Sequence, residues 1–321
     1  MAMERVPYLV GGGFEHSAEI MRAALATATS GAEGIVRPGD FRVTPTPVPG
    51  GSVLVLPGNG LLRNTYGGGG SQSYAVRAPE QTEVSILATG SAGGRSDLIV
   101  ARVDDPTYAG GEFDPETFEA AKFEVIRGVP ANTTSSKGLG LSYPATPLAL
   151  VTLPASTGTV TAEMIKDLRS VALPRTERRL YTIQPTSPVQ LPPNATAWAN
   201  FPRDRFSIPI PEWATHAVIH AELGSMFVNG SASNLAIVTG KVRFLLGSEA
   251  TEASWFTHRS NAQGLRFGTS VADTIAIPEA RRGTVALSAS QLISSTDSTA
   301  SWYMDTYSFS TVDVEFQERA E

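Results

Sequence analysis

The sequence predicts a mainly β protein built from two domains. Short runs rich in Val, Ile and Tyr recur along the chain, clusters of Gly, Pro, Asn and Ser separate them, and all four tryptophans lie in the second half. The length of 321 residues leaves room for two domains. We expect residues 1–171 to form a β-rich domain with one or two short helices and residues 172–195 to form a proline-rich linker. Residues 196–321 should form an antiparallel β-sandwich of jelly-roll-like form.

The first half should combine one amphipathic helix with several strands. Residues 15–29 carry an apolar stripe that includes Ile20 and Leu25, and Gly31 marks an end for a helix. In residues 97–103 both alternating faces are largely apolar, which predicts a strand in the middle of its sheet. The other β-like runs of this half are residues 52–58, 73–78, 83–89 and 122–128.

A second helix is expected at residues 161–169, where it would close the first domain. Thr161 can serve as its N-cap, and basic residues near its end suit the negative end of the helix dipole. We predict that the apolar face of this helix packs back on the first domain and that the helix contacts a partner protein. The residues expected at that interface are Met164, Ile165, Leu168 and Arg169.

The second half returns to β structure after a proline-rich segment. Residues 172–195 contain five prolines, which is typical of an extended linker, with a first strand as the alternative. From about residue 196 the β-like runs resume, and the last alternates apolar Val312, Val314 and Phe316 with acidic residues. The runs are residues 205–211, 216–223, 234–246, 264–271, 274–278, 284–293 and 306–318.

Composition excludes several classes of partner and site. The net charge of −6 and the scarcity of Lys argue against nucleic acid, because phosphate binding needs clustered basic residues. The chain has no Cys, so disulfides, thiolate catalysis and zinc–thiolate sites are excluded. No apolar run approaches the roughly 20 residues of a membrane span, and the first residues do not fit a signal peptide. We expect no nucleic acid partner and no membrane span.

No motif in the sequence predicts catalysis, a metal or a cofactor. His216 and His220 have the spacing of a helical metal site, but on the strand that their neighbours predict they would lie roughly 13 Å apart. The acidic stretch that contains Asp104, Asp105, Asp114 and Glu116 lacks EF-hand spacing and is interpreted as a solvated loop. No GxSxG occurs, and the glycine-rich loops lack the GK[ST] of a phosphate-binding loop. We therefore expect a protein that is not an enzyme.

One polar stretch, residues 248–263, could present an aromatic surface. It reads as a loop, and it holds a tryptophan beside other ring and basic side chains. Packing in a core is the alternative interpretation. The residues expected to bind a partner or ligand there are Trp255, Phe256, His258 and Arg259.

Five collinear stretches of the first half carry a resemblance to a known family. They are "GAEGIVRPGDFRV" (31–43), "GGSVLVLPGNGLLRN" (50–64), "GGRSDLIVARVDDPTY" (93–108), "FEVIRGVPA" (123–131) and "PLALVTLPASTGTVTAEMIKDLR" (147–169). Together they resemble the N-terminal domain of minor tail and baseplate proteins of long-tailed phages, especially those of actinobacteria, over residues 14–175. The resemblance implies a module that anchors the chain to the virion, followed by a variable part that projects outward.

The resemblance also sets the functional expectations. It implies a virion structural protein of the tail, assembled in the host cytoplasm, with other tail and baseplate proteins as partners and a homotrimer as the family's usual state. One alternative is a receptor-binding protein whose C-terminal domain recognises host cell-surface glycan. A tail-associated hydrolase and a head decoration protein are further alternatives.

Overall fold

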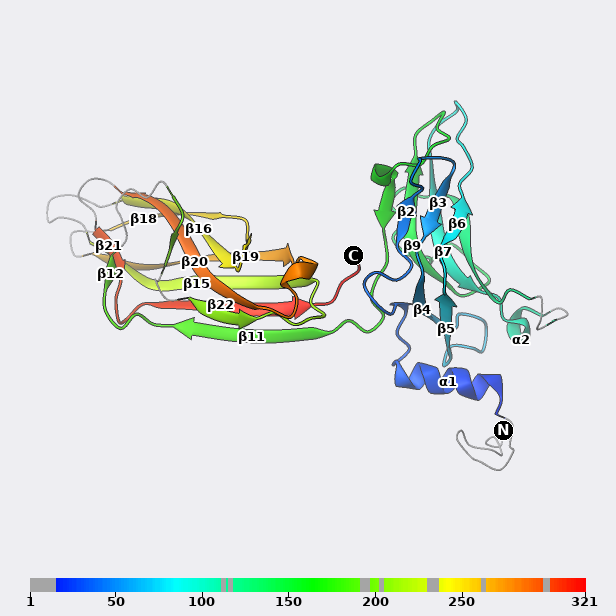
Figure 1. Ribbon diagram of the computed structural model, residues 1–321, viewed down its shortest axis with the longest axis horizontal. Helices are drawn as coiled ribbons and strands as arrows, with labels where there is room; N and C mark the ends of the chain where they lie inside the picture. Colours follow the sequence, from blue (N-terminus) through cyan, green and yellow to red (C-terminus); the bar gives the residue numbers. More distant parts are fainter. Residues whose placement is uncertain are drawn as a thin grey trace. The chain divides into compact units, whose positions relative to one another are not determined.

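The chain divides into two compact units. The computed structural model describes residues 16–110, 114, 118–190, 197–201, 205–229, 237–260, 264–296 and 301–321. Unit 1 comprises Met1–Leu173 together with Ala320–Glu321, and unit 2 comprises Pro174–Arg319 (Figure 1). No helix in the described part of the chain is long and apolar enough to cross a membrane.

Unit 1 consists of antiparallel strands in three small sheets, with one helix beside them. The first sheet has the order β1 (Gly34–Ile35), β4 (Gly58–Arg63), β5 (Ser73–Ala78). The second has the order β2 (Val43–Pro45), β3 (Ser52–Val55), β6 (Thr82–Ser85). The third has the order β10 (Ile165–Asp167), β9 (Ala145–Leu153), β7 (Arg95–Val103), β8 (Ala121–Val129). The helices of this unit are α1 (Ala18–Ala28), α2 (Pro106–Ala109) and the 3₁₀ turn η1 (Ala162–Met164).

Two predictions for unit 1 are confirmed. The helix expected at residues 15–29 is α1, and the hydroxyl of its N-cap Ser17 accepts a hydrogen bond from the backbone N–H of Ile20 at 3.2 Å. The strand expected in the middle of its sheet is β7, which pairs with β8 on one side and β9 on the other. Its residues Leu98, Ile99 and Val100 are completely buried.

The prediction of a helix at residues 161–169 is wrong. The chain makes only the single turn η1 and then forms β10, which pairs with β9 through Ile165↔Val151. Hydrogen bonding to the free edge of β9, together with the β-branched Ile165, outweighs a helical pattern that is only nine residues long. Met164, Ile165 and Leu168 pack against the cores of unit 1, and Arg169 is buried.

Unit 2 is a sandwich of two six-stranded sheets. One, here called the β15 sheet, contains β11 (Thr176–Ile183), β22 (Phe309–Gln317), β15 (His216–Asn229), β19 (Leu265–Ala276), β21 (Ser301–Met304) and β12 (Val189–Gln190). The other, the β16 sheet, contains β13 (Ala199–Asn200), β14 (Phe206–Pro209), β20 (Val285–Thr296), β16 (Ile237–Leu246), β17 (Glu249–Ala250) and β18 (Ser254–Arg259). A 3₁₀ turn, η2 (Glu279–Arg281), precedes β20.

The strand order of unit 2 is that of a jelly roll. We number its eight principal strands in chain order as β11, β14, β15, β16, β18, β19, β20 and β22. The β15 sheet then has the order 1-8-3-6 and the β16 sheet the order 2-7-4-5, which is the jelly-roll arrangement of two sheets. The predicted mainly β fold with a jelly-roll-like sandwich is therefore confirmed.

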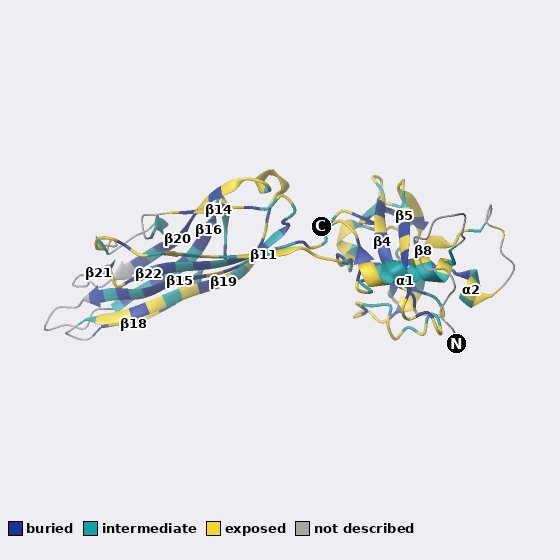
Figure 2. Cartoon of the chain, turned by 90° about the horizontal axis from the view of Figure 1, so that it is seen from below, coloured by how far each residue is buried: buried dark blue, intermediate teal, exposed yellow. Residues whose placement is uncertain are grey.

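Strict alternation along the strands builds the core of unit 2. Buried and less buried residues alternate along β22, where Val312, Val314 and Phe316 point inward as predicted (Figure 2). Trp302 is completely buried among Phe201, Phe256 and Phe267 of both sheets.

The prediction of a linker at residues 172–195 is wrong for its first part. Residues 176–183 form β11, which pairs with β22 along its whole length. The alternative, a first strand, is the one observed, because Tyr181 and Ile183 alternate inward and pack against the core of unit 2. Residues 191–196 lie outside the described part.

Candidate interaction surfaces

The stretch predicted to be a polar loop around Trp255 is an edge strand. Residues Ser254–Arg259 form β18, which pairs with β16. Phe256 and His258 therefore point into the sandwich, whereas Trp255 and Arg259 point outward. The four predicted residues do not share one surface, because the pleat of the strand separates them into two pairs.

The inward pair belongs to the aromatic core. The Phe256 ring lies 5.8 Å from the Trp302 ring, and the His258 imidazole stacks on Phe267 with centroids 3.9 Å apart. Burial lowers the pKa of His258 below its ordinary value, because the cationic form is poorly solvated there. His258 is thus placed as a neutral packing residue.

The outward Trp255 carries a cation on its ring. Its side chain is 71% exposed, and Nζ of Lys241, its cross-strand partner on β16, lies 4.4 Å from the ring centroid. This distance is within the range of a cation–π interaction. An exposed indole and an ammonium group thus form one feature on the outer face of the β16 sheet.

A second tryptophan–cation pair lies beside the first. Arg243 is two residues from Lys241 on the same outward side of β16, and its guanidinium carbon lies 4.2 Å from the ring centroid of Trp198. Its Nε donates a hydrogen bond to Oε1 of Gln291 on β20 at 2.9 Å. We call this set the Trp255 face; it comprises Trp198, Lys241, Arg243, Trp255, Arg259 and Gln291.

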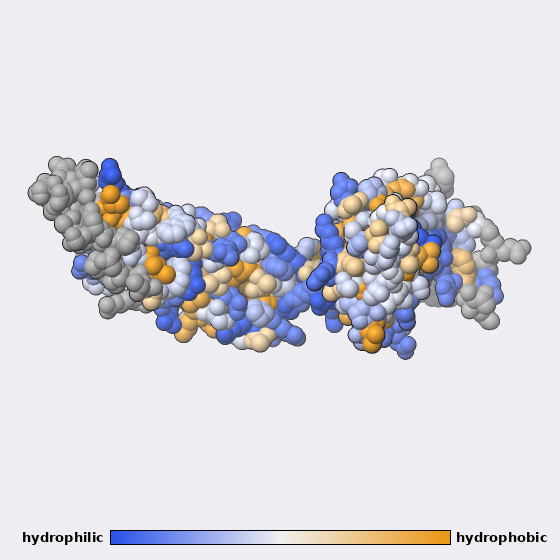
Figure 3. Space-filling view, turned by 90° about the horizontal axis from the view of Figure 1, so that it is seen from above, coloured by the Kyte–Doolittle hydropathy of each residue, from blue (hydrophilic) through white to orange (hydrophobic). Residues whose placement is uncertain are grey.

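Among the described residues, the cations of the Trp255 face lack carboxylate partners. Within the described ranges, Lys241, Arg243 and Arg259 form no ion pair. Hydrophobic patches in the space-filling view of unit 2 are separate and lie among hydrophilic residues (Figure 3). The Trp255 face is thus basic and aromatic, in a chain whose net charge is −6.

The outer face of the β15 sheet, in contrast, carries an ion pair. Arg178 on β11 binds Asp313 on β22, with Nε at 2.9 and 3.0 Å from the two carboxylate oxygens. The hydrogen bond from Arg178 lowers the pKa of Asp313. His216 and His220 lie on strand β15, as predicted, and His220 is the cross-strand neighbour of Asp313. Among the described residues no group of three or more His, Asp or Glu side chains could hold a metal ion.

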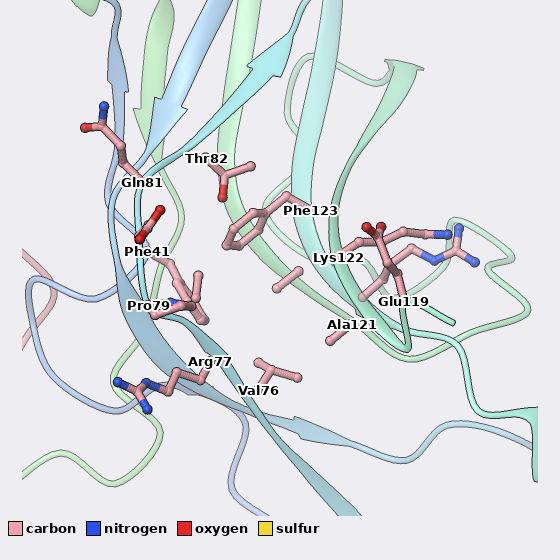
Figure 4. A pocket seen from close by; sticks show the side chains of 14 residues that line it. Phe41, Val76, Arg77, Pro79, Gln81, Thr82, Glu119, Ala121, Lys122 and Phe123 are labelled. Carbon is pink, nitrogen blue, oxygen red and sulfur yellow. The ribbon is translucent and has the colours of Figure 1, made fainter. Parts of the chain in front are cut away.

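Unit 1 carries a separate groove of about 580 Å³. The rings of Phe41 and Phe123 meet edge to face in it, with centroids 5.3 Å apart, and charged residues such as Arg77 and Glu119 line it further out (Figure 4). The groove is lined by parts of β5 and β8, and in the described structure each of these strands pairs on one side only. Unpaired strand edges offer backbone hydrogen bonds to another chain.

A polar network attaches α1 to the rest of unit 1. Arg22 donates from Nε to Gln72 at 2.6 Å, and its Nη1 lies 3.3 Å from Asp105. The hydroxyl of Tyr74 donates to the same carboxylate at 2.9 Å. Burial alone would raise the pKa of Asp105, but the hydrogen bonds from Tyr74 and Thr107 and the charge of Arg22 lower it overall.

Two residues of the acidic stretch, which was predicted to be a solvated loop, instead form contacts within the protein. Asp105 belongs to the α1 network, and Asp104 forms ion pairs with Arg102 and Lys122. Glu116 lies outside the described residues.

Arg169, predicted for an interface, instead donates from Nη1 to the carbonyl oxygens of Pro38 and Asp40 at 3.0 and 2.8 Å. It joins segments within unit 1.

Comparison with known proteins gives no family. No protein-family model and no curated protein sequence matches the chain. Among solved structures, the VP2 subviral particle of infectious bursal disease virus overlaps 91% of this chain and 73% of its own, at 14% identity and a TM-score of 0.25. The T13 viral particle of the same virus overlaps 87% of this chain and 71% of its own, at 13% identity and a TM-score of 0.24. Overlaps with TM-scores this low do not establish a common fold.

Proposed function

We propose that the chain is a virion structural protein, a minor component of a phage tail or baseplate. The observation that carries this proposal is a coincidence of boundaries. The stretches that resemble tail-anchoring domains run from residue 31 to residue 169, and the first segment of unit 1 ends at Leu173. A resemblance that ends where a compact unit ends supports the view that this unit is one module. The jelly roll that follows is an architecture used by viral capsid and lectin domains.

The proposed mechanism is association without catalysis. Unit 1 attaches the chain to other tail or baseplate proteins, and unit 2 projects from the particle. The groove between β5 and β8 offers apolar surface and free strand edges for such a contact. A stable interface of this kind buries roughly 1,200–2,000 Å². Assembly takes place in the host cytoplasm, and three copies associate around a cyclic axis.

The test is the composition of the particle. Virions of the phage that encodes this chain are purified on a density gradient. They are washed with salt to remove loosely bound protein and are then analysed by mass spectrometry. The chain is expected at a constant copy number that is small compared with that of the major tail protein. Its complete loss in the salt wash would contradict a structural role.

A host receptor-binding role is the second candidate function. The Trp255 face favours it, because the exposed Trp255 lies beside cations that form no ion pair among the described residues, and such a surface is suited to recognition. The tail-associated hydrolase has less support, since glycoside hydrolysis needs two positioned carboxyl groups and the Trp255 face has none. Turnover of host cell-wall glycan by the purified chain would revive that alternative.

A further inference from the structure

We propose that the Trp255 face binds an acidic carbohydrate polymer, one whose sugars carry carboxylate or phosphate groups. This inference goes beyond a structural role in the virion. It stands on unit 2 alone, so its failure and the failure of tail attachment would be seen in different experiments.

The first argument is the exposed indole. Trp255 leaves 71% of its side chain in water, and Lys241 lies over one side of the ring. A ring held by its cross-strand partner loses little further freedom when a ligand stacks on it. The C–H groups of a pyranose ring pack well on such a flat, electron-rich surface.

The second argument is uncompensated charge. Within the described part of the chain, Lys241, Arg243 and Arg259 have no carboxylate partner. Among the described residues Arg243 donates a hydrogen bond from Nε only. Its two Nη groups therefore remain available as donors to a ligand. A guanidinium fork matches the oxygens of a carboxylate or a phosphate.

The third argument is the spacing of these groups. Lys241 and Arg243 lie two residues apart on one side of β16, which places their backbones about 7 Å apart. Arg259 lies further along the neighbouring strand β18, on the same side of the sheet. Positive charges spread along a sheet face suit a polymer with repeated negative charges better than a single small anion.

A second copy of the chain is a poorer occupant. A carboxylate that it could offer is Asp313, on the outer side of the β15 sheet. There Asp313 is already bound by two hydrogen bonds from Arg178 Nε to its oxygens. Breaking that pair to form another brings little net gain, because exposed ion pairs contribute little to stability.

The test measures polymer binding to the full chain by isothermal titration calorimetry, a signal that does not depend on Trp255. The probes are polygalacturonate, purified wall teichoic acid and dextran, which carry carboxylate, phosphate and no charge respectively. We expect saturable binding of at least one acidic polymer, weakened by added salt, and none of dextran. Which acidic polymer binds identifies the anion.

Matched variants locate the site. The double variant Lys241→Gln with Arg243→Gln, and separately Trp255→Ala, should each weaken binding by about tenfold or more. Lys166→Gln, which removes an exposed lysine of unit 1, is the control and should bind as the parent does. A cooperative urea transition in each variant, with a midpoint close to that of the parent, shows that the variants fold.

Four results would overturn the proposal. The first three are no binding of either acidic polymer, equal binding of dextran, and unchanged affinity in both Trp255-face variants. A fourth is a loss of oligomer mass by light scattering in Trp255→Ala without any polymer binding, which would assign the face to a second copy.

Discussion

The indole of Trp302 is completely buried and lies 5.8 Å from the ring of Phe256, whose chain neighbour Trp255 is 71% exposed. One residue step along β18 thus separates the core of unit 2 from its candidate ligand surface. All four tryptophans belong to unit 2, so tryptophan fluorescence reports on that unit alone.

Trp302→Ala should destabilise unit 2 strongly. Removing a fully buried indole leaves a large cavity and costs about 3–5 kcal/mol in the free energy of unfolding. Trp255→Ala is the matched control, and it should cost less than about 1 kcal/mol because the ring is exposed. Urea denaturation followed by fluorescence measures both. Similar costs for the two changes would contradict the assigned burial.

Unit 2 should lose stability as the pH falls below neutrality. Burial lowers the pKa of both His258 and His216 in the folded state, and the nearby charges of Arg319 and Arg282 lower that of His216 further. The unfolded chain then binds more protons than the folded one below about pH 6.5, so folding free energy is lost there.

The check is the urea midpoint between about pH 8 and about pH 5.5. His258→Phe keeps a ring against Phe267 and removes one titrating group, so its midpoint should fall less steeply with acidification. His216 should account for the remaining slope. A variant with the slope of the parent would refute the part assigned to His258.

Gly34→Ala should destabilise unit 1. Gly34 has φ of 138°, and a Cβ at this position would lie 2.2 Å from the carbonyl oxygen of Ser170. Relief of that overlap costs on the order of 1–3 kcal/mol. Calorimetry should show an earlier transition, with the fluorescence-detected unfolding of unit 2 unchanged. Gly39→Ala, where a Cβ meets nothing within 4 Å, is the control and should leave the transition in place.

Asp105→Asn should loosen α1. No residue of α1 is buried, so its attachment relies on Arg22 and the carboxylate that Arg22 shares with Tyr74. We expect faster amide hydrogen exchange over residues 18–28 and a cost of about 1–3 kcal/mol. Glu19→Gln changes only an exposed pair of Arg22 and should leave exchange unaltered. Unchanged exchange in Asp105→Asn would show that other contacts hold the helix.

The alternation of apolar and polar residues correctly predicted those strands that have one apolar and one polar face. Val312, Val314 and Phe316 alternate with acidic residues, and β22 formed as expected. The helix predicted at residues 161–169 was wrong because Ile165 pairs with the edge of the preceding strand β9, a contact that helical periodicity does not reveal. The loop predicted around Trp255 was wrong because His258, a polar residue, points into the core, so the polar sequence hid a strand.

Only part of the Trp255 face could be predicted from the sequence. Trp255 was identified, but Trp198 and Arg243 were not, because their pairing depends on strands that meet only in the folded sheet. The available signal was the alternation of Lys241 and Arg243 with the apolar Val242 and Phe244, which places both cations on one outer face.

The most direct test of the central claim is the position of the chain on the particle. Virions carrying a small gold label on an exposed residue of unit 2 would be imaged by electron microscopy. A tail or baseplate component that attaches through unit 1 predicts gold at the tail, displaced outward from its surface. Gold over the head, or particles without gold although the labelled chain is present in the lysate, would contradict the account.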